Sequence, residues 1–256
     1  MPPILQNVMV EDADLPALLP QIPSGQGQAS GSDLVFTPSD LAGLFVWLRA
    51  DQGITLSGAN VTVWADQSGN GNNTTSGTSG AWAASDPQYN GQASISFVHA
   101  SSNHLTIGSL SGSTGQPFTS IIVGNSSNAA TEGTFQNGTS STCSAGFFDD
   151  VTGNIFMSAG TQQDTNVSGL NPCIMALIGN GANCQSFVNN SQTPVVTANM
   201  GTNSFSGQGM QIGTGGVTSL DGKIVEVLVY NGALTPRQLH LVFSYLANRY
   251  GILGVV

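Results

Sequence analysis

The chain has 256 residues, and all-β sandwiches of this length are commonly single domains with one large core. Only 7% of the residues are charged, and four basic residues stand against fourteen acidic ones, which gives a net charge of -10. Phosphate backbones and anionic membranes attract clustered lysine and arginine, so this composition argues against binding to nucleic acid or to an anionic membrane.

The first twenty residues do not resemble a secretory signal peptide. They lack a basic n-region, and Glu11, Asp12 and Asp14 lie where such a peptide is hydrophobic. No window of eighteen apolar residues occurs, so we expect no membrane-spanning helix. The rest of the chain nevertheless has the polar, lysine-poor composition of an extracellular protein. We therefore predict a protein made in a host cytoplasm and exposed on the surface of a virus particle.

Residues 1–33 are predicted to form an extended N-terminal arm. They hold five of the eleven prolines and end in SGQGQASGS, a flexible linker composition. Proline prevents a regular element in LPALLPQIP. We expect the arm to become ordered against another virion protein, in the capsid or the tail; the alternatives are a disordered tail and an arm folded back on its own domain. The anchoring side chains would be those of Ile4, Leu5, Leu15, Leu18, Leu19 and Ile22.

From residue 34 onward the pattern is typical of short strands joined by turns, because apolar runs recur between clusters of Gly, Ser, Asn and Thr. This number and spacing of strands predict one all-β domain over residues 34–256, an antiparallel sandwich of two sheets. The predicted strands are 43–51, 61–66, 93–98, 104–108, 118–124, 145–150, 154–159, 173–179, 185–190, 209–213 and 222–230.

Three cysteines are an odd number, so at least one thiol is unpaired within the chain. Cys173 and Cys184 flank a hairpin that we expect to turn near Gly181, and symmetric pairing about that turn leaves them too far apart for a disulfide. We interpret these two residues and Cys143 as small buried apolar side chains.

One helix is predicted near the C-terminus. Thr235 is a suitable N-cap, Pro236 fits the first helical position, and Gln238 completes a capping box. Gly251 provides a C-terminal stop. An apolar stripe would pack on the sandwich, formed by Leu239, Val242, Phe243, Leu246 and Tyr250.

The order of several segments resembles the concanavalin A-like lectin/glucanase superfamily, specifically the laminin-G-like domains of bacterial and phage surface proteins. These segments are LAGLFVWLRADQGI, VTVWADQSGNGNN, ASISFVHASSNHLTIG, FTSIIVG, SFVNNSQ and, most specific, LDGKIVEVLVYNGALTPRQLHLVFSYLANRYGI. The resemblance implies a jelly roll of two curved sheets in a family whose members bind glycans, often with calcium, or serve as structural modules. Asn189 and Asn190 stand where the family commonly has Asn-Gly, and asparagine tolerates the positive φ of such a turn.

The stretch DQSGNGN, which begins at Asp66, imitates the first half of a calcium loop. Its twelfth position is Gly77 where an EF-hand needs a bidentate glutamate, so an EF-hand is excluded. One hypothesis is a calcium site formed by Asp66, Asn70 and Glu226. The favoured interpretation is a metal-free turn in which Asp66 and Asn70 satisfy backbone amides.

Glu226 is unusual because it lies in the apolar strand KIVEVLVY. Alternation places Val225 and Val227 on one face of this strand and Ile224 and Glu226 on the other, with both faces covered. A covered carboxylate needs a partner, which could be Arg49, a backbone amide or the same calcium ion.

Aromatic rings could bind sugars by stacking. Trp82 and Tyr89, in a loop-like segment, are the best exposed candidates, whereas Trp47 and Trp64 belong to strand patterns and are predicted to lie in the core.

Catalysis is not expected. The chain lacks the alternating acids of a retaining glycosidase, and Asp149 and Asp150 are adjacent, so in a strand they would face opposite sides. The histidines show no metal-ligand spacing. We therefore predict a non-enzymatic virion surface protein, a head decoration or fibre module present as a homo-oligomer or multicopy array. The alternative is an adhesin or receptor-binding domain that recognises cell-surface glycans.

Overall fold

The computed structural model describes residues 36–75, 77, 80–112, 115–127, 132–137, 145–149, 153–189, 191–205, 209–214 and 219–252, with the backbone alone for 132–137 and 145–149. The predicted arm with its six anchoring residues, Cys143 and Asp150 lie outside these ranges. In the part of the chain that is described, no helix is long and apolar enough to cross a membrane.

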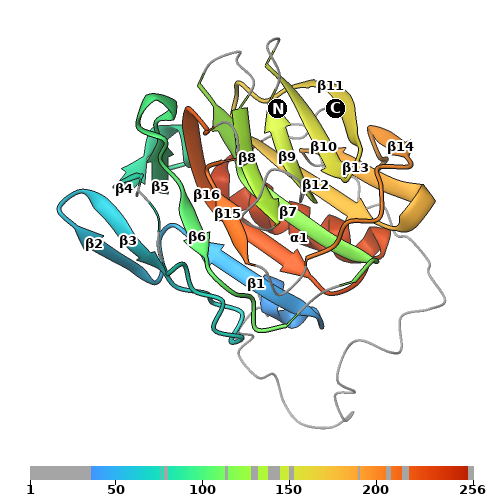
Figure 1. Cartoon of the computed structure of the whole chain (residues 1–256), viewed down its shortest axis with the longest axis horizontal. Helices are drawn as coiled ribbons and strands as arrows, with labels where there is room; N and C mark the ends of the chain where they lie inside the picture. Colours follow the sequence, from blue (N-terminus) through green and yellow to red (C-terminus); the bar gives the residue numbers. More distant parts are fainter. Residues whose placement is uncertain are drawn as a thin grey trace, which may run out of the picture. The chain divides into compact units, whose positions relative to one another are not determined.

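Antiparallel strands form two sheets (Figure 1). The ten-stranded sheet contains β1 (Leu44–Arg49), β2 (Ile54–Ser57), β3 (Asn60–Trp64), β4 (Ala81–Asp86), β5 (Gln92–Phe97), β7 (Phe118–Ser126), β12 (Cys173–Gly179), β13 (Cys184–Val188), β14 (Val196–Ala198) and β16 (Gly222–Tyr230). The six-stranded sheet contains β6 (Leu105–Ile107), β8 (Glu132–Asn137), β9 (Ala145–Asp149), β10 (Asn154–Ala159), β11 (Gln162–Ser168) and β15 (Met210–Ile212). Short 3-10 turns are η2 (Pro38–Asp40), η3 (Pro87–Tyr89), η4 (His99–Ser101) and η5 (Gly181–Asn183).

The larger sheet runs in the order β14-β13-β12-β7-β16-β5-β4-β3-β2, and β1 also pairs with β16. The smaller sheet runs β11-β10-β9-β8-β15-β6. The predicted all-β antiparallel sandwich is confirmed, and each of the eleven predicted strands is present. The strands β2, β4, β8, β11 and β14 were not predicted. Segments such as β11 (QQDTNVS) contain too few apolar residues to reveal a strand, and their pairing with neighbours decides their structure.

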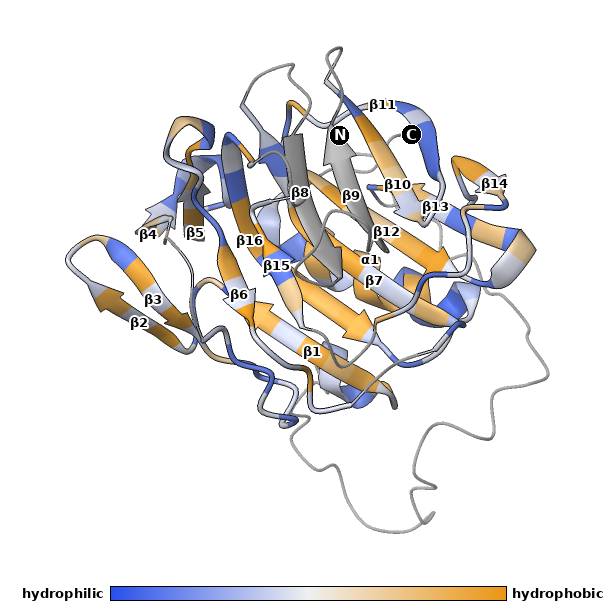
Figure 2. Ribbon diagram, in the orientation of Figure 1, coloured by the Kyte–Doolittle hydropathy of each residue, from blue (hydrophilic) through white to orange (hydrophobic). Residues whose placement is uncertain are grey.

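The larger sheet is covered on both faces. On β1, Val46 and Leu48 join the core between the two sheets, while Trp47 joins a second core against the C-terminal helix. On β7, Ile122 lies in the first core and Ile121 in the second. A strand buried on both faces is largely apolar, and Figure 2 shows this hydrophobic character along β1, β7 and β12.

The helix α1 (Pro236–Tyr250) forms the layer outside the larger sheet (Figure 1). The capping box is present, because Thr235 Oγ1 accepts from Gln238 N at 3.3 Å and Gln238 Oε1 accepts from Thr235 N at 2.9 Å. Gly251 adopts a φ of 67°, the left-handed conformation of a helix stop. The five residues of the predicted apolar stripe are buried, so the predicted helix and its buried face are confirmed.

A β-bulge in β16 changes the predicted alternation. The register with β7 shifts between Ile224 and Glu226, at the point where Val225 O accepts from Ala50 N at 2.9 Å. Ile224 therefore joins Val227 in the core between the sheets, and Val225 lies on the helix side. The prediction of which sheet face Ile224 and Val225 occupy is therefore wrong. The bulge adds one residue to β16, so the side chains that precede it point to the opposite faces from those that strict alternation predicts.

The hairpin of β12 and β13 pairs Ile178 with Gln185. Cys173 and Cys184 are both buried and no disulfide joins them to each other, which confirms the interpretation of these two residues. Asn189, which follows the last residue of β13, has a φ of 57°, as the turn was expected to require.

Candidate functional site

The loop that begins at Asp66 is a hydrogen-bonded turn. Asp66 Oδ1 accepts from Trp47 N at 2.8 Å and from Ser68 N at 2.9 Å, and Oδ2 accepts from Asn72 N at 2.9 Å and from Ser68 Oγ at 2.7 Å. Four donors thus occupy the carboxylate and attach the loop to β1. The interpretation of Asp66 as an acceptor for backbone amides is confirmed.

Asn70 acts differently from the prediction. Its Nδ2 donates to the carbonyls of Leu44 at 3.0 Å and Phe45 at 3.1 Å, so it satisfies backbone acceptors instead of amides. Asn72 Nδ2 also donates to Phe45 O, at 2.8 Å. These amides satisfy carbonyls at the start of β1, where the register with β16 is irregular.

Glu226 does not join the loop as a metal ligand. Its carboxylate is fully buried; Oε1 accepts from Trp47 Nε1 and Oε2 from Tyr250 OH, both at 2.6 Å. Burial raises its pKa to about 7, against the opposing effect of these two hydrogen bonds and of nearby arginines. The predicted partner Arg49 pairs instead with Asp51 at 2.8 Å. The structure therefore does not assemble Asp66, Asn70 and Glu226 as calcium ligands, and no other metal-binding group of three acidic, His or Cys residues occurs among the described residues.

The two aromatic residues proposed for sugar stacking are engaged elsewhere. Tyr89 is fully buried, and its hydroxyl donates to Asn125 Oδ1 at 2.7 Å, so the prediction that it is exposed is wrong. Trp82 is half-buried and donates from Nε1 to Ala50 O at 2.8 Å. Trp47 and Trp64 lie in the two cores as predicted.

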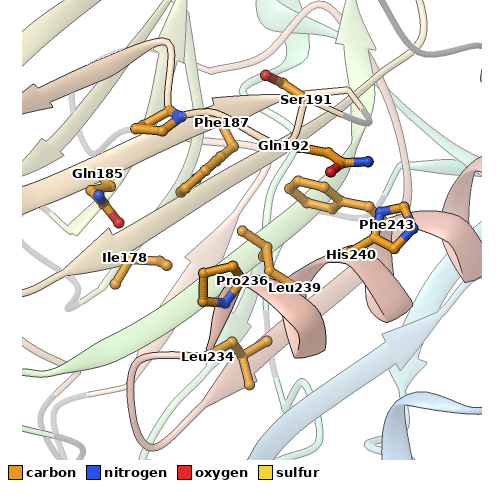
Figure 3. Close-up of a pocket in the computed structure, with 11 residues that line it drawn as sticks. Ile178, Gln185, Phe187, Ser191, Gln192, Leu234, Pro236, Leu239, His240 and Phe243 are labelled. Carbon is orange, nitrogen blue, oxygen red and sulfur yellow. The ribbon is translucent and has the colours of Figure 1, made fainter. Parts of the chain in front are cut away.

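A cavity of about 100 Å³ lies between the β12–β13 hairpin and the first turns of α1 (Figure 3). Its floor consists of buried apolar side chains. The rings of Phe187 and Phe243 meet edge to face with centroids 6.2 Å apart. The floor residues are Ile178, Phe187, Leu234, Leu239 and Phe243.

Polar side chains surround this floor. Gln185 and Ser191 are half-buried, whereas Gln192 and His240 are exposed. Ser191 Oγ donates to Thr193 O at 2.6 Å. Within the described part of the chain, the side chains of Gln185, Gln192 and His240 have no hydrogen-bond partner. They are free to bind a ligand.

The local structure explains how these residues meet. Gln185 and Phe187 are two apart on β13, so both point to the helix side of the sheet, while Cys184 and Val188 point into the core between the sheets. On α1, Leu239 and Phe243 are four apart and share the buried face. His240 follows Leu239 and therefore lies at the border between the buried face and solvent.

None of the residues that line the cavity is Asp, Glu, Lys or Arg. Such a site combines an apolar surface with amide, hydroxyl and imidazole groups. It suits an uncharged ligand that has one apolar face and several hydroxyls. This site was not predicted from the sequence, although both elements that form it were, because no local pattern encodes the approach of the hairpin to α1.

No protein-family model and no curated protein matches the sequence. Solved structures do match. The first is an arabinofuranosidase complexed with arabinofuranosyl-α-1,2-xylobiose, with a TM-score of 0.59 and 14% identity over 75% of this chain. The second is domain 4 of an extracellular arabinanase from Geobacillus stearothermophilus in complex with arabinotriose, with a TM-score of 0.52 and 13% identity over 78% of this chain. The third is the receptor-binding domain of botulinum neurotoxin type G, with a TM-score of 0.55 and 8% identity over 80% of this chain.

The chain shares its antiparallel β-sandwich fold with the matched parts of these proteins. It spans 98% of the arabinanase domain but only 51% of the arabinofuranosidase and of the toxin domain. At these low identities the similarity establishes the fold alone.

Proposed function

We propose that this domain binds a neutral glycan in the cavity between the β12–β13 hairpin and α1. The observation that carries the proposal is a buried apolar floor beside the side chains of Gln185, Gln192 and His240, which have no hydrogen-bond partner among the described residues. A sugar ring offers C–H groups to an apolar surface and hydroxyls to amides and imidazoles, so it matches both parts of the cavity.

The structural neighbours support this choice. The arabinofuranosidase and the arabinanase domain were solved with arabinose-containing oligosaccharides, and the neurotoxin domain is named for receptor binding. Within the shared fold, we propose the laminin-G-like type, which the segment ending in YLANRYGI favours. Binding to cell-surface glycans is a function that fits this domain.

We propose binding without catalysis. Hydrolysis of a glycosidic bond needs two carboxyl groups on opposite sides of that bond, and the cavity lining provides none. Display on a virion stays a prediction based on composition, since the segment proposed to anchor it, residues 1–33, lies outside the described residues.

The proposal is tested by titrating the full chain with neutral oligosaccharides, beginning with arabinotriose, and by screening it on a glycan array. The double variant with Gln192→Ala and His240→Ala removes two exposed rim groups, and we expect it to weaken binding about tenfold or more. Gln52→Ala is the matched control, because Gln52 is exposed and lies outside the cavity.

Two results would contradict the proposal. Unchanged binding by the double variant would place the sugar elsewhere on the domain. A complete absence of binding to neutral glycans would reject glycan recognition itself.

A further inference from the structure

We infer that the cavity recognises the methyl group of a sugar, as carried by a 6-deoxy or an N-acetylated sugar, at the end of a glycan. This inference rests on the proposed function and names the ligand class of the same site. It follows from the chemistry of the floor, the size of the cavity and the position of the polar rim.

The floor offers no polar partner to a group that enters it. The five floor side chains are between 1% and 7% exposed and are all hydrocarbon. Backbone groups beside them are already engaged: Leu239 N donates to Thr235 O at 2.9 Å, and Ile178 and Gln185 are a pair in the β12–β13 ladder. A hydroxyl placed there would lose its hydrogen bonds to water, whereas a methyl group would gain from burial.

The size of the cavity limits what can enter. A volume of about 100 Å³ is well below the roughly 300–1,000 Å³ of pockets that enclose drug-sized ligands. One substituent and one edge of a single ring fit such a space, and several sugar units do not. The ligand therefore enters end-on, as a terminal residue.

The rim then binds the remaining hydroxyls. Gln185 reaches from β13, Gln192 from the following loop and His240 from α1, so donors and acceptors approach from three sides of the floor (Figure 3). Arg237 follows Pro236 on α1 but does not line the cavity. With no Lys or Arg in the lining and a net charge of -10 on the chain, the electrostatics of the chain do not favour anionic sugars at this site.

Matched pairs of monosaccharides test the inference on the unmodified full chain by calorimetric titration. L-Fucose and L-galactose differ only by the 6-hydroxyl, and N-acetylglucosamine and glucose differ by the acetamido group. We expect the methyl-bearing member of at least one pair to bind about 10- to 100-fold more tightly, as apolar pockets discriminate against an added hydroxyl. Preference in the first pair alone identifies a 6-deoxy sugar, and in the second pair alone an N-acetylated sugar.

Two variants distinguish the contribution of the cavity floor to binding from that of the polar rim. Ile178→Thr places a hydroxyl in the floor and should reduce the preference within the pair. Gln192→Ala should weaken both members equally and leave their ratio unchanged, and because Gln192 is exposed this variant should fold normally.

The outcomes also separate this inference from the proposed function. If both members of each pair bind equally and Gln192→Ala weakens both, the methyl inference is wrong and glycan binding at the cavity stands. If no neutral sugar binds, in mono- or oligosaccharide form, both are rejected. If the second sugar of an oligosaccharide adds more than about tenfold to the affinity, the end-on mode is wrong.

Discussion

The polar side chains near the two ends of α1 differ in whether they are hydrogen-bonded within the protein. Near its C-terminus, Tyr250 donates to the buried carboxylate of Glu226, which Trp47 also contacts. Near its N-terminus, α1 borders a cavity where the side chains of Gln185, Gln192 and His240 have no hydrogen-bond partner among the described residues. Both regions lie on the same face of the larger sheet. The comparison indicates that a buried polar group whose hydrogen bonds are all made within the protein has a structural role. An accessible polar group without such a hydrogen bond is available to a ligand.

The arginines around Glu226 reinforce its structural role. Asp51 Oδ2 accepts from Arg49 Nη2 at 2.8 Å and from Arg249 Nη2 at 2.6 Å. Arg49 lies over the Trp47 ring at 5.4 Å, and Arg249 lies over the Tyr250 ring at 5.6 Å. Two of the four basic residues in the chain therefore hold β1 and α1 together around one buried acid. The cavity has no comparable network.

The largest effect should come from pH, because Glu226 is an acid whose pKa burial raises from 4.5 to about 7. The folded protein binds this proton more tightly than the unfolded chain, so the contribution is most favourable at low pH and is lost as pH rises from about 4.5 through 7. The difference corresponds to about 3 kcal/mol of unfolding free energy. Urea unfolding at several pH values should show this loss, and Glu226→Gln should remove it.

A second titration lies outside that pH range. Burial acts to raise the pKa of Asp86, but hydrogen bonds from Lys223, Ser94 and Gln88 and the charge of Lys223 outweigh it and lower the pKa below 3.8. Its stabilisation is present at higher pH and is lost only as pH falls below about 4. A stability that stays flat between pH 4.5 and 7.5 would contradict the assignment for Glu226.

Tyr250→Phe should give the next largest effect. It leaves Glu226 Oε2 without its hydroxyl donor, and an unsatisfied buried charged group costs about 2 kcal/mol. Tyr245→Phe is the matched control on the same helix, because the buried Tyr245 hydroxyl has no hydrogen-bond partner in the described structure. Its removal should change stability by less than about 0.5 kcal/mol. Equal losses in the two variants, measured by urea unfolding, would refute the distinction between partnered and unpartnered hydroxyls.

The loop at Asp66 should show a smaller effect. Asp66→Ala removes the acceptor of four hydrogen bonds, but solvent can replace part of them, so we expect a loss of about 1 kcal/mol. The same loss should occur with calcium and with a chelator, since donors already occupy the carboxylate. Asp164→Ala is the control, because among the described residues Asp164 accepts only from the nearby Asn166 N. A calcium-dependent rise in Tm that disappears in Asp66→Ala would restore the metal hypothesis.

Structure that is determined locally could be predicted from the sequence. The caps of α1 and the turn at Asp66 depend on residues a few positions apart, and the apolar runs of β7 and β12 identify strands covered on both faces. Features that depend on distant segments could not be predicted. The bulge at Val225 lies where Val225 O accepts from Ala50 N, and Tyr89 is buried by packing against the distant ring of Tyr250 on α1.

The cavity was missed for the same reason. Ile178 and Phe187 lie on a hairpin more than forty residues before Leu234 and α1 in the sequence, so no local period brings them together. Each residue looked ordinary in its own element: Gln185 as a polar position in a strand, His240 as an exposed position on a helix. Only the packing of α1 on the larger sheet turns them into one site.

The smallest effect on stability should come from the rim. Gln192→Ala removes an exposed amide that has no partner among the described residues, so the unfolding free energy should change by less than about 0.5 kcal/mol. Gln116→Ala is the contrasting variant, because its amide donates to Gly201 O and Asn203 O and accepts from Gly181 N, and it should lose about 1–2 kcal/mol. Calorimetric titration of both variants with the best neutral sugar completes the comparison. Gln192→Ala should lose affinity for the sugar and keep its stability, whereas Gln116→Ala should lose stability and keep its affinity. If Gln192→Ala is instead destabilised as much as Gln116→Ala, the rim is structural and the proposal of a binding site in the cavity is wrong.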